Sequence, residues 1–262
     1  LDGKTYDMYH KNLFHTKLIN MDIVSPEPYR VNEYFNQKCS IAQAFDILIN
    51  KQGVRELPKP TLVLSKEELL YARKAIDEIK EKTKKEKVVI VQPFGRAIKQ
   101  IDNSFVDQSN RSIEFHNLKN IIRKLMEKDF AVVLMSEFGI DFKDAGFPDE
   151  VALPEKVTLR QWAGIIKYAD VFLGCDSVGQ HLAYAVGTPA NVVLGATYPE
   201  NTSYPNAENF NIIDLGQMTR EYDPIRISFD ERISRKNETI MSMTPEIEDY
   251  VVSAVNGDPI EE

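Results

Sequence analysis

Short apolar runs alternate with amphipathic stretches along the chain from Val88 onward. The runs are continuous, which is typical of parallel strands buried on both faces, and they lie at 88–92, 131–135, 171–174, 191–194 and 211–215. The stretches between and after them carry apolar residues at helical spacing and predict helices at 115–128, 158–167, 179–186 and 244–254. Strands and helices in this order predict an α/β fold with a doubly wound parallel sheet.

The first part of the chain has a different pattern. Residues 1–60 are irregular, with aromatic residues scattered among polar ones, and only 41–52 show helical spacing. The run at 61–64 (TLVL) follows two prolines and is predicted as a short strand. Ser65, with Glu68 three residues later, forms a capping box that predicts the start of a long helix.

A Lys/Glu-rich run, KEKTKKEK at residues 80–87, ends this long helix. Its mixed charges are typical of a solvated helix end, which we favour over a nucleic-acid contact. Because the pattern changes here, we predict a boundary between an N-terminal part at 1–80 and a Rossmann-like part at 81–262.

Composition argues against several classes of protein. The formal net charge is −8 and the pI about 5.2, whereas a nucleic-acid-binding protein needs a basic face, so no nucleic-acid partner is expected. Cys39 and Cys175 are the only cysteines and lack metal-ligand spacing, which argues against a zinc site and a disulfide scaffold. The sequence shows no apolar run of the ~20 residues that a membrane span needs, and no secretory signal. We therefore expect a cytoplasmic protein with at most peripheral membrane contact.

The strongest candidate for chemistry is the loop and helix start at 174–189, GCDSVGQHLAYAVGTP. In doubly wound sheets, ligands bind beyond the carboxyl ends of strands, where helix N-termini attract anions. Asp176 and Ser177 offer N-cap oxygens, Gly179 would let the backbone approach a diphosphate, and His181 lies in the first helical turns. The alternative is an ordinary N-cap and a well-packed helix, with His181 in a structural role.

Two further loops follow predicted strands. In the loop at 92–99, Gly95 permits an open turn, and Arg96 or Lys99 could reach a terminal phosphate. In the loop at 135–139, Glu137 could hold ribose hydroxyls. Taken alone, each segment is as well or better explained by solvated charges.

Together, several segments resemble glycosyltransferase family nine, the ADP-heptose:lipopolysaccharide heptosyltransferases. The family motif Asp-Ser/Thr-Gly-x-x-His-Leu-Ala, followed by Ala-x-Gly-x-Pro, is similar to DSVGQHLAYAVGTP at 176–189. VTLRQWAGIIKYAD at 157–170 resembles its Thr-Ser-Leu helix, and MSMTPEIEDYVVSAV at 241–255 resembles its C-terminal helix. The similarity extends in the right order over about 60–256.

The resemblance implies a two-lobed GT-B-type fold and a metal-independent transfer of a sugar from a nucleotide diphosphate to a saccharide or glycolipid hydroxyl. The nucleotide sugar would be a substrate, with no further cofactor and no bound metal. Asp176–Gly179 would hold the diphosphate, Lys99 or Arg96 the phosphate charge, and Glu137 the ribose. Val157 and Thr158 lie where the family's backbone meets the base.

The chain also departs from the family pattern. Val178 stands between Ser177 and Gly179, a polar stretch occupies 101–110, and the family's N-terminal strand with its Gly-Asp catalytic base is not found. Residues 1–60 resemble only the end of that incomplete N-terminal lobe, so the catalytic residue stays unassigned. Two alternatives are therefore an inactive glycosyltransferase-like structural or carbohydrate-binding module and, less favoured, a sugar epimerase.

Overall fold

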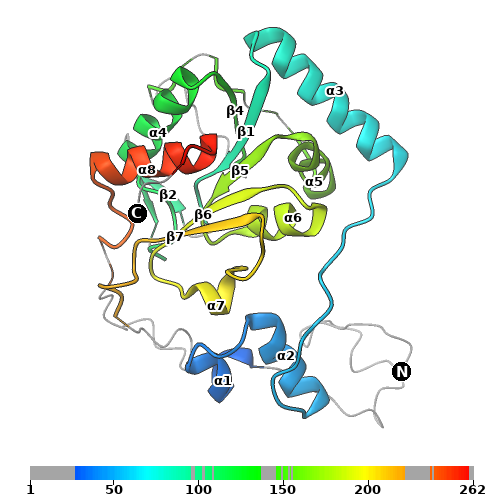
Figure 1. Ribbon diagram of the computed structural model, residues 1–262, viewed down its shortest axis with the longest axis vertical. Helices are drawn as coiled ribbons and strands as arrows, with labels where there is room; N and C mark the ends of the chain where they lie inside the picture. Colours follow the sequence, from blue (N-terminus) through cyan, green and yellow to red (C-terminus); the bar gives the residue numbers. More distant parts are fainter. Residues whose placement is uncertain are drawn as a thin grey trace.

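A five-stranded parallel sheet forms the centre of the protein (Figure 1). We analysed a computed structural model, which describes residues 27–95, 98–101, 104–107, 109–136, 146–148, 150–152, 154, 156–221, 237 and 239–259. The strand order is β4-β1-β5-β6-β7, and all four pairings are parallel. The strands are β1 (Lys87–Gln92), β4 (Phe130–Leu134), β5 (Val171–Gly174), β6 (Ala190–Leu194) and β7 (Phe210–Asp214). This arrangement confirms the predicted doubly wound parallel α/β sheet.

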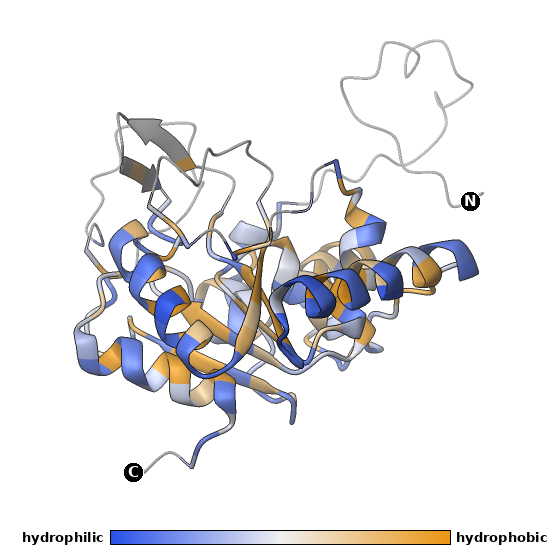
Figure 2. Ribbon diagram, turned by 90° about the horizontal axis from the view of Figure 1, so that it is seen from above, coloured by the Kyte–Doolittle hydropathy of each residue, from blue (hydrophilic) through white to orange (hydrophobic). Residues whose placement is uncertain are grey.

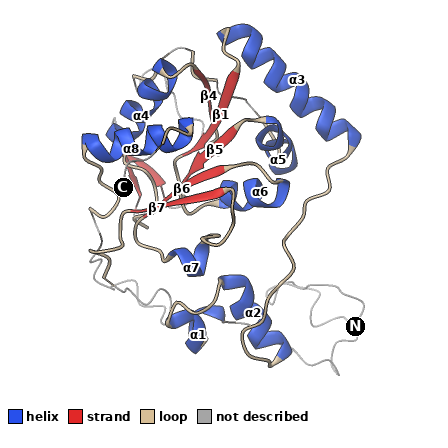
Figure 3. Cartoon of the chain, viewed as in Figure 1, coloured by secondary structure: helices blue, strands red, loops and turns tan. Residues whose placement is uncertain are grey.

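Helices cover both faces of this sheet (Figures 1 and 3). One layer consists of α4 (Phe115–Glu127) and α8 (Pro245–Asn256), and the other of α3 (Lys66–Thr83), α5 (Leu159–Tyr168) and α6 (Val178–Val186). Successive residues of β1 pack alternately against the two layers. Val89 and Val91 belong to the core formed with α4 and α8, and Val88 and Ile90 to the core formed with α3, α5 and α6. Figure 2 shows the resulting concentration of apolar residues on the strands and on the helix sides that face them.

Side-chain caps determine where the long helices begin. Ser65 caps α3 and Thr158 caps α5, and in return the backbone N–H of each donates to the side chain of the glutamate or glutamine three residues on. Thr244 caps α8 through the backbone N–H of Ile247. These caps confirm the helix starts predicted at all three positions.

A small helical unit precedes the sheet in the chain and contacts the loop that follows β6. It contains the 3-10 helix η2 (Pro28–Arg30), α1 (Asn32–Phe35) and α2 (Ile41–Asn50), the last of which confirms the predicted helix at 41–52. The side-chain amide of Asn201, in α7 (Pro199–Thr202), donates to the carbonyl oxygens of Tyr34 at 3.1 Å and Cys39 at 2.8 Å. The unit is thereby fixed to the loop that follows β6, next to α7 in Figure 1.

One local prediction was wrong, and one pair of strands was not predicted. Residues 61–64 are not a strand. Leu62 and Leu64 pack against the core formed with α3, α5 and α6, and the Val63 carbonyl accepts a hydrogen bond from Arg160 at 2.7 Å. The segment after Gly95, which includes the polar stretch at 101–110 and carried no strand prediction, contains the antiparallel pair β2 (Ile98–Ile101) and β3 (Ser104–Asp107). The strand pair forms because apolar residues of this segment pack against the rest of the protein: Phe105 lies between Phe94 and Phe115.

Helix α3 belongs to the sheet layer, although it precedes the predicted boundary at residues 80 and 81. Ala72 of α3 lies against Gly164 of α5 so closely that a Cβ built on the glycine would be 2.8 Å from the Ala72 Cβ. Glu68 pairs with Arg160 at 2.5 Å across the same contact. The division into two domains stays a prediction.

Among the described residues, no helix is both long and apolar enough to span a membrane.

Candidate functional site

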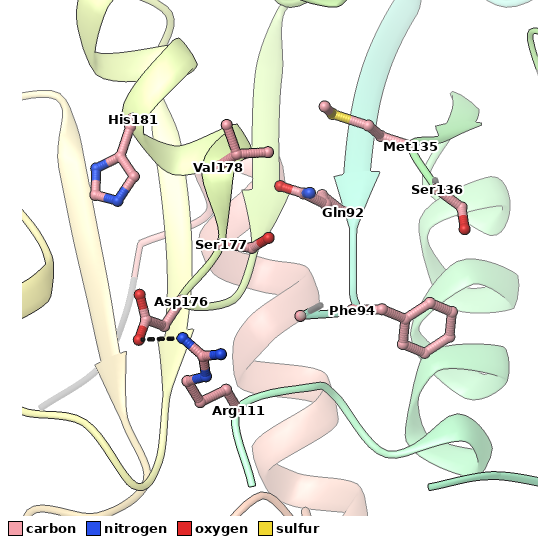
Figure 4. Close-up of a pocket in the computed structure, with 10 residues that line it drawn as sticks. Gln92, Phe94, Arg111, Met135, Ser136, Asp176, Ser177, Val178 and His181 are labelled. Atoms are coloured by element: carbon pink, nitrogen blue, oxygen red, sulfur yellow. Dashed lines mark ion pairs between the residues drawn. The ribbon is translucent and has the colours of Figure 1, made fainter. Parts of the chain in front are cut away.

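The carboxyl ends of β1, β4 and β5 meet at one edge of the sheet and line a cavity of about 410 Å³ (Figure 4). Its lining residues lie at the end of β1, in the turns that follow β1, β3, β4 and β5, and in the first four residues of α6, which is the usual position of ligand sites in such sheets. The lining consists of Gln92, Phe94, Gly95, Arg111, Met135, Ser136, Asp176, Ser177, Val178 and His181. The structure therefore brings together four of the predicted site residues: Gly95, Asp176, Ser177 and His181.

The start of α6 differs from the predicted N-cap. Ser177 is the N-cap residue, but its side chain makes no capping hydrogen bond. The backbone N–H of Gly179 donates instead to Oε1 of Gln92 at 2.6 Å. Asp176 accepts from Nε2 of Gln180 at 3.3 Å and lies 3.6 Å from Nη1 of Arg111. The expectation that Asp176 and Ser177 cap the helix was wrong, because the Gln92 amide has taken the capping role.

Gly179 is buried between α6 and the sheet. A Cβ built there would lie 2.5 Å from Cζ of Phe172 and would also collide with Oε1 of Gln92. The residue is absent from the cavity lining. Gly179 was expected to let the backbone approach a diphosphate; in the structure its N–H is bonded to Gln92, and the glycine is required by the close packing of α6 on β1 and β5.

Arg111 supplies the cavity's basic group, and the sequence analysis did not identify it. Its Nε donates to Oγ of Ser109 at 3.1 Å, and its guanidinium faces Asp176. The backbone here is held by Asp107, whose carboxylate accepts from the backbone N–H groups of Ser109 at 2.7 Å and Ser112 at 2.9 Å. Burial raises the pKa of Asp107, but these and further hydrogen bonds outweigh it and keep that pKa below its ordinary value. Asp107 is thus an ionised anchor for the turn.

The same turn fixes Gly95 at the end of β1. The backbone N–H of Gly95 donates to Oγ of Ser112 at 2.8 Å, and Ser112 Oγ itself donates to Asp107 at 2.5 Å. A sequence signal for this turn exists in retrospect: Asp107, Ser109 and Ser112 have the short spacing of local side-chain-to-backbone bonds.

Three other predicted site residues stay untested. Arg96 and Glu137 lie outside the described residues, as does the side chain of Lys99, whose backbone belongs to β2. The choice between Arg96 and Lys99 therefore stays open.

Thr158 caps α5, with its Oγ1 accepting from the backbone N–H of Gln161 at 3.2 Å. The neighbouring Val157 lines a second cavity of about 300 Å³, which shares Gln92, Met135 and Ser136 with the first. The predicted contact of Thr158 with a base stays a prediction.

His181 is held by an aromatic partner. Its Nδ1 lies 2.8 Å from the hydroxyl of Tyr204, and the two rings meet edge to face. Burial lowers the pKa of His181, an effect that the nearby Asp176 carboxylate only partly offsets, so the imidazole is neutral near pH 7. The cavity thus combines one guanidinium, one carboxylate, a neutral imidazole and the start of a helix. Within the described part of the chain, no group of three or more His, Cys, Asp or Glu side chains forms a metal site.

Part of the chain is similar in sequence to known glycosyltransferases. Residues 116–223 match the family model described as glycosyltransferase family 9 (heptosyltransferase). Lipopolysaccharide heptosyltransferase 3 of Escherichia coli is 32% identical over 120 residues, which are 42% of this chain and 31% of that protein.

Two solved structures share the fold. ADP-heptose LPS heptosyltransferase II of Escherichia coli is 15% identical, with a TM-score of 0.52 over 83% of this chain. A family 9 glycosyltransferase of Veillonella parvula is 9% identical, with a TM-score of 0.60 over 90% of this chain. The chain spans 62% of the length of each of these structures. The likeness confirms the GT-B-type fold class, and the match over residues 116–223 confirms the resemblance to glycosyltransferase family nine that the motifs indicate.

Proposed function

We propose that this chain provides the nucleotide-sugar-binding part of a heptosyltransferase-like glycosyltransferase. The donor would be a sugar, heptose-like, on a nucleoside diphosphate, and the acceptor a hydroxyl group of a saccharide or glycolipid. The names of two relatives support this choice, since one is an ADP-heptose and the other a lipopolysaccharide heptosyltransferase. Neither is matched over two thirds of its length, so donor and acceptor are both part of the proposal.

One observation carries the proposal: Arg111 and the N-terminal turn of α6 lie on the same cavity. A guanidinium can hold two phosphate oxygens at once, and a helix N-terminus adds partial positive charge and backbone donors. A departing nucleoside diphosphate carries the negative charge that develops during sugar transfer. Stabilising that charge is the largest contribution such a site can make to catalysis.

The adjoining cavity fits the nucleoside. It is lined by Met135, Pro154, Val157, Leu159 and Trp162 with the polar Gln92, Ser136 and Lys156, so that apolar surface is available for a base. Each cavity has a volume within the range of small-molecule sites, about 300–1,000 Å³. Because the cavities share Gln92, Met135 and Ser136, one ligand could place its base in the second and its diphosphate in the first.

We further propose that the transfer needs no divalent metal. The positive charge that a metal would give to the leaving diphosphate would come from Arg111 and the α6 dipole. The sequence has no Asp-x-Asp motif, a pattern that metal-dependent glycosyltransferases use. The catalytic base stays unassigned, since none of the cavity residues has a position that identifies it as one.

Calorimetry tests this function directly. The whole protein is titrated with ADP, UDP, GDP and CDP, and with adenosine, in the presence of EDTA. We expect one diphosphate to bind and its nucleoside to bind much more weakly. Absence of binding by every diphosphate, in a protein shown to be folded, would contradict the proposal and favour the inactive module.

A further inference from the structure

Tyr204 contacts His181 from outside the cavity. Its hydroxyl lies 2.8 Å from Nδ1 of His181, the nitrogen that therefore cannot face a ligand. His181 itself lines the cavity, so Nε2 is the ring nitrogen left for a bound molecule. The chemistry that His181 offers depends on which of its two nitrogens carries the proton.

The Tyr204 ring is fixed by neighbours on two elements. It stacks on Tyr184 of α6, with centroids 3.6 Å apart and an angle of 14°, and it meets Phe210 of β7 edge to face. Lys59, from the segment before α3, lies 4.6 Å above the Tyr184 ring on this cluster. Because the phenol ring has little freedom to turn, its hydroxyl has a defined position against His181.

The direction of this hydrogen bond follows from the inventory of donors. A phenol has one proton, and burial together with Tyr184 raises the pKa of Tyr204 to about 12, so that proton is present near pH 7. His181 Nδ1 is the partner that the structure places within bonding distance of the hydroxyl. If Nδ1 carried the proton, it would donate to the phenol oxygen, and the phenol proton would need a second acceptor. Among the described residues His181 Nδ1 is the one acceptor within bonding distance of this hydroxyl, so the arrangement in which the phenol donates to Nδ1 pairs the proton of Tyr204 and the lone pair of Nδ1 together.

We propose that Tyr204 is a positioning residue that fixes His181 in its Nε2–H form, so that His181 donates a hydrogen bond to a phosphate oxygen of the bound nucleotide. An Nε2–H group suits an anionic ligand, whereas an unprotonated Nε2 would repel it. This inference rests on the proposed function for the identity of the ligand, but the protonated nitrogen of His181 can be determined without any ligand.

The first experiment measures the imidazole ¹⁵N chemical shifts of the free protein at pH 7.5. The chain has four histidines, and the signals of His181 are assigned by their loss in His181→Gln. We expect the Nε2–H form in the wild-type protein and a mixture of both forms in Tyr204→Phe, which keeps the aromatic ring. Tyr184→Phe is the matched control, since its hydroxyl does not contact His181, and it should keep the Nε2–H form.

The second experiment measures ADP affinity in the same proteins. Tyr204→Phe should weaken ADP binding about five-fold and leave adenosine binding unchanged, because a neutral hydrogen bond contributes about 1 kcal/mol. Tyr184→Phe should bind ADP like the wild type.

Any other result of these two experiments excludes a specific part of the proposal. An Nδ1–H form in the wild type, measurable even if the variant fails to fold, excludes the proposed bond direction. An unchanged form in Tyr204→Phe excludes its positioning role, and an unchanged ADP affinity despite a changed form excludes the phosphate contact. Failure of the proposed function itself would look different: the wild type would bind no diphosphate, while the ¹⁵N shifts would still report on Tyr204.

Discussion

The side chain of Gln92 at the end of β1 accepts a hydrogen bond from the backbone N–H of Gly179 at 2.6 Å. Gln92 is buried, and its oxygen lies where the side-chain oxygen of an N-cap residue would otherwise be. The bond connects the first turn of α6 directly to the neighbouring strand. It thereby holds the edge of the cavity at a fixed distance from the sheet.

The first prediction concerns this contact. Gly179→Val should destabilise the protein by about 1–3 kcal/mol or more, because the new side chain would overlap Phe172 and Gln92 in a packed core. Urea unfolding measures the change. From the sequence alone, Gly179 was expected to give a diphosphate access to the backbone; in the structure its missing side chain serves core packing.

Gly53→Ala is the matched control, since a Cβ at Gly53 would meet nothing within 4 Å. It should leave stability unchanged or raise it slightly, because alanine restricts the unfolded chain. A Gly179→Val protein as stable as the wild type would show that α6 can move away from Phe172.

The sheet was predictable because its strands are buried on both faces. Residues such as Val89 and Ile90 face different helix layers, so both must be apolar and the runs become continuous. Helix starts were predictable wherever the cap lies three residues from its partner in sequence, as at Ser65 and Thr158.

The site was less predictable because its contacts join residues far apart in sequence. Gln92 caps a helix 87 positions away, and no local pattern indicates this. Arg111 reaches the cavity only because Asp107 folds the intervening turn, so Arg96 and Lys99, nearer to the strand, were the obvious choices. The apolar run at 61–64 has the composition of a strand, but it pairs with no strand of the sheet, and Leu62 and Leu64 pack against the helix layer instead.

The second prediction identifies the phosphate-binding cation. Arg111→Gln should weaken ADP binding by about 1.5–3 kcal/mol, the usual contribution of a hydrogen bond to a charged group, and should leave adenosine binding nearly unchanged. Isothermal calorimetry at fixed ionic strength measures both affinities. An equal loss for nucleoside and diphosphate would mean that Arg111 supports the fold of the cavity and does not contact phosphate.

Arg123→Gln is the control for charge, since Arg123 is exposed on α4 and does not line the cavity. It should bind ADP like the wild type. Arg96→Gln and Lys99→Gln, measured in the same series, would decide whether either predicted residue also contributes to diphosphate binding.

The third prediction concerns pH and the contact between α4 and α8. Glu248 is buried and accepts from Asn117 at 2.8 Å, Asn120 at 2.9 Å and Lys124 at 3.0 Å. Burial raises the pKa of Glu248, but these bonds outweigh it and keep that pKa below 4.5. Because the folded-state pKa is the lower one, its stabilisation is complete above pH 4.5 and is lost as the pH falls through the folded-state value.

Glu248→Gln should therefore lower the free energy of unfolding by about 1–3 kcal/mol near pH 7, and the difference from the wild type should shrink below about pH 4.5. Urea unfolding between pH 7 and pH 3.5 measures this. Glu127→Gln, an exposed position on α4, is the control and should show no such trend. A difference that is constant down to pH 3.5 would show that the charge of Glu248 contributes nothing.

The last prediction concerns the bridge between the small helical unit and the sheet. Asn201 is buried, and its side-chain amide donates to the carbonyls of Tyr34 in α1 and of Cys39, just before α2. Asn201→Leu removes the amide donor from both oxygens. The Tyr34 carbonyl still accepts from the backbone N–H of Gln37 at 3.1 Å, so the main cost, about 1–3 kcal/mol if the oxygen stays buried, falls on the Cys39 carbonyl. The unit can avoid this cost by separating from α7, since water then solvates the Cys39 oxygen. Amide hydrogen exchange should therefore become faster in α2 while α4 and α5 keep their protection. Asn209→Leu is the matched control, because the side-chain amide of Asn209 donates to the Gly187 carbonyl at an exposed position, at 3.3 Å. This variant should leave exchange in α2 unchanged. Equal exchange in α2 for Asn201→Leu and the wild type would show that the apolar contacts of the unit, and not the Asn201 amide, hold it against α7.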